Sequence, residues 1–180
     1  WLMPHGWVLP HRESTWFPVS LHTVIEFAAI VIAFLVFSVA WHTSSIGQPG
    51  NILILGCGFL AVGLIDMGHV LSYKGMPDFV TPSDPEKAIQ FWLMARYVAA
   101  TVLLLGSFPI PPRIWGGPRY VLLAATLSVV AVVYVVGLYY PFVWPRTFIA
   151  GQGLTLFKVV AEYGVIALSV LAVCAFFRWG

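Results

Sequence analysis

The hydrophobic positions of the chain form five long runs, and the segments between them are rich in proline, glycine or polar residues. A run of about 20 apolar residues is long enough to cross the hydrocarbon core of a bilayer as a helix. The pattern predicts helices at about residues 17–41, 51–73, 90–109, 120–139 and 154–177. The sequence therefore predicts an all-α integral membrane fold, a bundle of about five transmembrane helices.

The first 16 residues do not fit this pattern, because prolines interrupt them and tryptophans are frequent. Tryptophan is typical of the membrane interface. We interpret residues 1–16 as an interfacial N-terminal segment and residues 17–180 as a single transmembrane domain. The chain begins at Trp1 without an initiator methionine, which is typical of a start partway through a longer protein or of a disordered or processed start.

Composition narrows the class of protein further. Hydrophobic residues make up 60% of the chain and charged residues 9%, whereas soluble domains carry about 25% charged residues. The partner implied is the lipid bilayer. The few basic residues are scattered, which excludes a nucleic-acid interface. Cys57 and Cys174 lie far apart inside apolar runs, and we expect free thiols.

Five spans place the two ends of the domain on opposite sides of the membrane. We call side A the side of the N-terminus and of the 74–89 and 140–153 loops, and side B the side of the C-terminus. Basic residues are about equally numerous on the two sides but denser on side B. The positive-inside rule then mildly favours side B, with the C-terminus, as the cytoplasmic side.

The charges inside the predicted spans lie at one depth. Counted along each helix at 1.5 Å per residue, they agree to within about one helical turn, in the leaflet of side A. Two histidines lie one turn from two of these acids. The set is His22, Glu26, Asp66, His69, Arg96, Lys158 and Glu162. The fourth span carries no charge, so we expect it to be peripheral.

Three interpretations of this cluster remain open. It is a structural polar network, a metal site, or a pocket for a small ligand or proton relay. For a metal, His22, Glu26, Asp66 and His69 offer two nitrogens and two carboxylates, which suit copper, iron, zinc or manganese. Haem with the two histidines as axial ligands is an alternative, and Met76 is a candidate soft ligand for copper(I). His5 and His11 are candidates to cap the site from side A.

Four stretches of the chain resemble a known family. They are LHTVIEFAAIVIAFLVFSVAWHT, GLIDMGHVLSYKGMPDF, FWLMARYV and GLTLFKVVAEY. Together they resemble the bacterial membrane-associated sensor domains of the third type, from about Val19 to the end of the chain. That family is an integral-membrane input module of histidine kinases, diguanylate cyclases and other signalling outputs.

The resemblance implies a membrane-embedded sensory input domain in signal transduction, such as a two-component system, in the bacterial inner membrane with a cytoplasmic C-terminus. It does not identify what is sensed; from the polar cluster we expect a metal ion or small ligand to be detected in the outer leaflet. The alternative is a membrane metalloprotein or haem-binding redox subunit. We expect this chain to be non-catalytic and to form a homodimer, with a cytoplasmic signalling domain C-terminal to Gly180. The family pattern also matches a supporting set: Trp41, Tyr73, Lys74, Gly75, Met76, Trp92, Arg96, Lys158, Glu162 and Tyr163.

Overall fold

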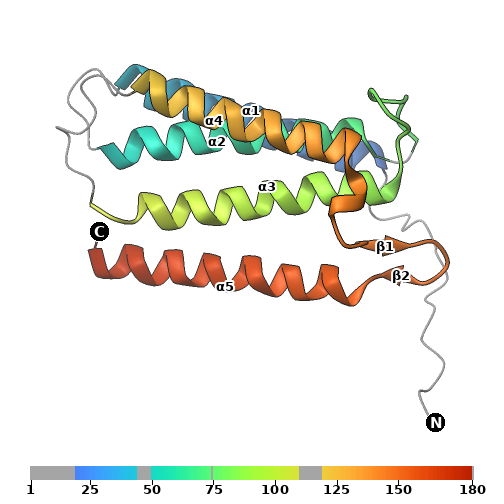
Figure 1. Ribbon diagram of the computed structural model, residues 1–180. Helices are drawn as coiled ribbons and strands as arrows, with labels where there is room; N and C mark the ends of the chain where they lie inside the picture. The colour runs from blue at the N-terminus through green and yellow to red at the C-terminus, as the bar shows by residue number, and fades with distance from the viewer. Residues whose placement is uncertain (1–18, 44–49, 74, 110–118, 180) are drawn as a thin grey trace, which may run out of the picture.

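The computed structural model describes residues 19–43, 50–73, 75–109 and 119–179, which form five long helices and a small hairpin (Figure 1). The helices are α1 (Val19–Thr43), α2 (Gly50–Leu71), α3 (Pro85–Gly106), α4 (Arg119–Tyr139) and α5 (Leu156–Trp179). Between α4 and α5 lie the 3-10 turn η3 (Pro141–Val143) and the strands β1 (Phe148–Ile149) and β2 (Gly153–Leu154). The two strands pair antiparallel, with Phe148 opposite Leu154.

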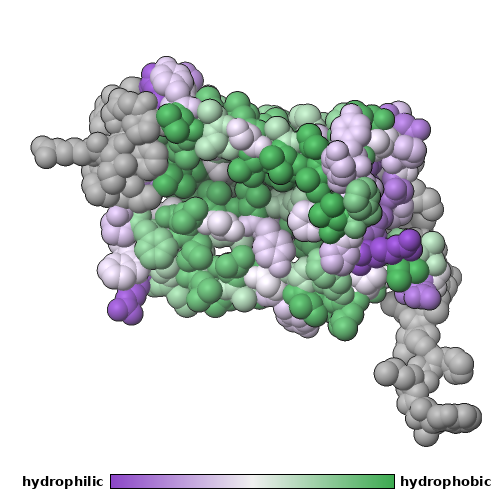
Figure 2. All heavy atoms as spheres, in the orientation of Figure 1, coloured by the Kyte–Doolittle hydropathy of each residue, from purple (hydrophilic) through white to green (hydrophobic). Residues whose placement is uncertain are grey.

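All five helices are long and apolar enough to cross a membrane. The flank of the molecule in Figure 2 is mostly hydrophobic, and hydrophilic residues gather at its two ends. Side A carries the beginnings of α1, α3 and α5, the end of α2 and the hairpin (Figure 1). The predicted all-α transmembrane bundle is confirmed, with the short hairpin as an addition that hydropathy did not reveal.

The most buried of these helices is α2, which packs against α1, α3 and α4. Glycines allow this close approach, because a methyl group in their place would meet a neighbouring helix. A Cβ on Gly56 would lie 2.4 Å from the Cβ of Ala40 in α1, and one on Gly58 would lie 2.2 Å from Val102 in α3. The centre of the bundle therefore depends on small residues at helix crossings.

Gly56→Ala is expected to destabilise the bundle, because α1 must move to accommodate the methyl group. Ala40 cannot yield by rotating its side chain, so the expected loss is about 1–3 kcal/mol. Unfolding in mixed micelles, followed by helical circular dichroism, measures it. Ala124→Val adds volume at an exposed position of α4 and is expected to change stability by less than about 0.5 kcal/mol. Equal effects of the two variants would contradict the packing role of Gly56.

The helix α3 begins five residues earlier than the sequence predicted. Asp84 caps it by accepting a hydrogen bond from the Lys87 backbone N–H at 2.8 Å, and Pro85 follows in the first turn. Proline is well suited to that position because it lacks an N–H that would otherwise need a partner. The charged residues after it had indicated a loop, and the prediction of residue 90 as the beginning was wrong for that reason.

The helices α1, α4 and α5 are the least buried of the five. Val130 and Gly137 are the buried residues of α4, which is otherwise largely exposed to the membrane as predicted. The helix α5 is still more exposed, although it carries three charged side chains. It lies at the edge of the bundle beside α3 (Figure 1). Charge content was therefore an incomplete guide to which helix lies outermost.

Candidate metal centre

Three potential metal ligands converge near side A, on α1 and α2. The ligand atoms of His22, Glu26 and His69 all lie within 4.8 Å of one another. We call this set the His–Glu cluster. His22 and Glu26 share a face of α1 because they are one turn apart. His69 faces them from α2 and is buried, whereas the two α1 residues are half-buried.

The orientation of the His69 ring is fixed from outside the cluster. Its Nδ1 lies 2.8 Å from the carbonyl oxygen of Ala88 in α3. A carbonyl oxygen can only accept, so Nδ1 carries the hydrogen and Nε2 retains the lone pair. This is the arrangement that orients histidine ligands in metal sites. The ring of Tyr73 packs against both imidazoles, with ring centroids 5.4 Å from His22 and 6.4 Å from His69.

The fourth expected ligand, Asp66, has a different principal partner. Its Oδ2 accepts a hydrogen bond from Arg96 Nη2 of α3 at 2.5 Å. Its Oδ1 is buried and accepts no hydrogen bond from the described residues. Glu26 and His69 nevertheless lie within electrostatic range of this carboxylate. Asp66 therefore joins the His–Glu cluster to α3, and one of its oxygens is left for a further partner.

The charge of the cluster favours a cation. Among the described lysines and arginines, Arg96 pairs with Asp66 and Lys158 pairs with Glu162, whereas Glu26 faces two imidazoles. A carboxylate in a membrane span is costly unless a cation balances it. Ligand atoms bonded to one ion at about 2.0–2.2 Å lie about 3–4.4 Å apart. The upper limit of 4.8 Å on the separations within the cluster is close to this range, so at most small side-chain movements would be needed to close it around an ion.

The two histidines could also face each other across a haem iron, because their ring centroids are 6.2 Å apart. A porphyrin would have to lie between the rings. Glu26 lies within 4.8 Å of the ligand nitrogens of both histidines, so its carboxylate would have to make room for a porphyrin between the rings. The geometry therefore fits a single ion better than haem.

A second polar group links α3 to α5. The Lys158 ammonium lies 5.3 Å from the centroid of the Trp92 ring and 2.6 Å from Glu162 Oε1. The Arg96 guanidinium lies 5.9 Å from the same ring. The sequence had predicted one cluster from four helices. The structure resolves it into the His–Glu cluster, the Asp66–Arg96 pair and this Trp92 group.

Other residues of the predicted supporting set lie elsewhere. Trp41 packs against Phe37, Tyr120 and Arg119 at side B. It is 19 residues from His22, which is about 28 Å along α1, so its assignment to the site network was wrong. Tyr163 is exposed on α5. Met76 is half-buried in the loop after α2, and Lys74, His5 and His11 lie outside the described residues.

Two residues that the sequence placed in a loop organise the side A rim. Glu86 accepts hydrogen bonds from the backbone N–H groups of Thr147 and Phe148, at 2.7 and 2.6 Å. Lys87 is buried and donates to the carbonyl oxygens of Phe79 and Thr81. Both hold the side A loops against α3. The capping pattern Asp84-Pro85 was the signal that could have placed them in a helix.

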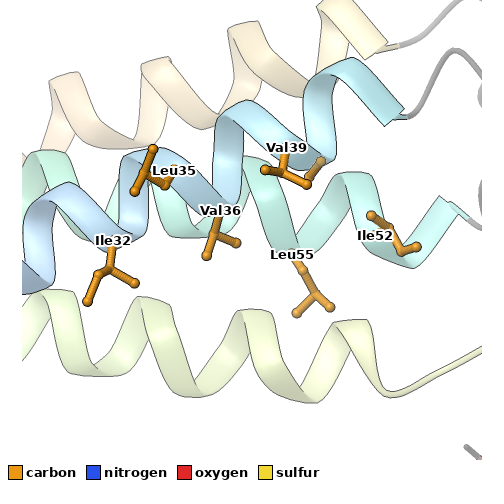
Figure 3. Close-up of a pocket in the computed structure, with 7 residues that line it drawn as sticks. Ile32, Leu35, Val36, Val39, Ile52 and Leu55 are labelled. Carbon is orange, nitrogen blue, oxygen red and sulfur yellow. The ribbon is translucent and has the colours of Figure 1, made fainter.

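A separate groove of about 400 Å³ lies along α1 and α2. Aliphatic side chains such as Ile32, Val36 and Leu55 line it, as the carbon-only side chains in Figure 3 show. It offers no donor or acceptor to a polar ligand or an ion. The candidate chemistry of the described residues is therefore concentrated at the His–Glu cluster.

Comparison with known proteins agrees with this architecture. The family model of the MASE3 membrane-associated sensor domain matches residues 16–179. No curated protein and no solved structure matched the chain. The match covers all five transmembrane helices and nearly the whole chain. This chain therefore belongs to the MASE3 family of membrane-associated sensor domains.

Proposed function

We propose that this sensor domain detects a divalent first-row metal ion at the His–Glu cluster. The single observation that supports it most strongly is the convergence of His22, Glu26 and His69, with the other nitrogen of His69 already bonded to Ala88. Two imidazoles and a carboxylate suit zinc, iron, manganese or copper. Asp66 Oδ1 is the candidate fourth ligand, because Asp66 lies one turn before His69 on α2 and this oxygen is buried without a described hydrogen-bond donor.

The proposal also includes the orientation of the domain in the membrane and its partners. The denser basic residues of side B favour a cytoplasmic C-terminus, which puts the cluster in the outer leaflet of the bacterial inner membrane. From there it samples metal ions that arrive from outside the cell. The output is a cytoplasmic histidine kinase or diguanylate cyclase domain C-terminal to α5, in a homodimer. Metal occupancy must favour one helix arrangement over another to act as a signal.

Metal titration of the purified domain tests the proposal. The wild-type domain is expected to bind one Zn²⁺ per chain in competition with a chromophoric chelator. Glu26→Gln is expected to weaken binding about 10–100-fold, because an amide replaces a charged ligand. His42→Ala is the matched control, since His42 lies on the same helix at side B. Unchanged affinity in Glu26→Gln, or an equal loss in His42→Ala, would exclude this site.

A further inference from the structure

The connection between α5 and the rest of the helical bundle runs through α3. Among the helices, α3 provides the main contact of α5. The Tyr97 hydroxyl of α3 donates to the carbonyl oxygen of Ala161 at 2.9 Å, and Gly164 packs against the same hydroxyl. A change at the His–Glu cluster, which lies on α1 and α2, therefore reaches α5 through α3.

A series of polar contacts connects α2 to α5 through α3. Asp66 of α2 pairs with Arg96 of α3, and Arg96 lies over the ring of Trp92. Lys158 of α5 lies over the same ring and pairs with Glu162 one turn further along. Two cations from two helices thus share one indole. A displacement of one cation changes the energy of the other through the ring and through their mutual repulsion.

A metal ion beside Asp66 would act directly on the first of these contacts. A divalent cation near Oδ1 competes with Arg96 for the carboxylate charge and repels the guanidinium. The Arg96 side chain is about one-third exposed, so it has room to withdraw, whereas Asp66 is buried. In the structure Arg96 is bonded to Asp66 while its guanidinium lies 5.9 Å from the Trp92 ring centroid. With a metal ion on Oδ1, the guanidinium would leave Asp66 and move closer to Trp92 and Lys158.

We infer that metal occupancy of the His–Glu cluster moves α5 through the Asp66–Arg96 pair, Trp92 and the Lys158–Glu162 pair. This inference rests on the proposed metal-sensing function and assigns the positioning residues that connect the site to the output helix. Coupling between two sites is reciprocal. A change at the Lys158–Glu162 pair must therefore alter the metal affinity of the cluster, although neither residue is a ligand.

Glu162→Gln tests this reciprocity. Removing the carboxylate leaves Lys158 unneutralised beside Trp92, which favours Arg96 bonded to Asp66. The expected result is a Zn²⁺ dissociation constant raised at least 5-fold, the lower end of typical coupling. Tyr163→Phe is the neighbouring control on the exposed face of α5, and Asp78→Asn in the exposed side A loop removes the same charge away from the route. Both are expected to stay within about 2-fold of wild type.

A distance measurement on the same variants reports the movement itself. Spin labels at Cys174, an exposed thiol of α5, and at Ser38→Cys on the exposed face of α1 are followed by pulsed electron resonance, with Cys57 replaced by alanine. Zn²⁺ is expected to shift the interspin distance in the wild-type background and not in Glu162→Gln. If the wild-type domain binds stoichiometric Zn²⁺ but the interspin distance does not shift, the coupling is overturned and the metal-sensing function stands. The same conclusion follows if Glu162→Gln has the Zn²⁺ affinity and the distance shift of the wild type. Absence of Zn²⁺ binding in wild type overturns the metal-sensing function and the coupling with it.

Discussion

Arg96→Met is expected to lower the free energy of unfolding of the domain by about 3 kcal/mol, because it leaves the Asp66 carboxylate buried without its cation. Breaking a fully buried pair costs about 3–5 kcal/mol, and the partial exposure of Arg96 places the expected value at the lower end. Unfolding by sodium dodecyl sulfate in mixed micelles, followed by circular dichroism, measures the loss.

The second half of this experiment separates a broken ion pair from lost packing. Asp66→Asn combined with Arg96→Met removes both charges, and the double variant is expected to recover most of the stability lost in Arg96→Met. Arg119→Met removes an arginine whose described contacts are aromatic rings and a tyrosine hydroxyl, and is expected to cost less than about 1 kcal/mol. No recovery in the double variant would contradict the account of Asp66 as a buried charge.

Zn²⁺ at about 1,000 times its dissociation constant is expected to stabilise the wild-type domain by about 4 kcal/mol, since it binds the folded state and bridges α1 to α2. The double variant His22→Ala/His69→Ala is expected to show no such stabilisation, because it removes both imidazoles of the His–Glu cluster. Thermal unfolding in detergent with and without Zn²⁺ provides the measurement. An equal Zn²⁺ effect in the double variant would place the bound metal elsewhere.

The sequence predicted the membrane architecture because long apolar runs have few alternatives in a bilayer. Depth along each helix also predicted that His22, Glu26 and His69 lie at one level of the bundle, and the structure brings these three together. The position of His22, Glu26 and His69 at one end of the bundle was predictable, because helix spacing determines which side chains share a face.

Depth could not determine which helix pairs with which. Arg96 and His69 are both near Asp66 in depth, and only the packing of α2 against α3 assigns the carboxylate to Arg96. Trp41 matched the family pattern, but its position at the far end of α1 depends on the length of the helix and not on residue type. Glu86 and Lys87 looked like loop residues because their hydrogen bonds to the side A loops are contacts distant in sequence.

The central claim is that the His–Glu cluster holds a metal ion, and metal content tests it most directly. The domain is purified from cells without a chelator, analysed by inductively coupled plasma mass spectrometry and examined by visible absorption. We predict about one first-row metal ion per chain, no Soret band, and loss of the metal in His22→Ala/His69→Ala. A Soret band, or a metal-free wild-type domain that also fails to take up Zn²⁺, Mn²⁺, Fe²⁺ or Cu⁺, would contradict the claim.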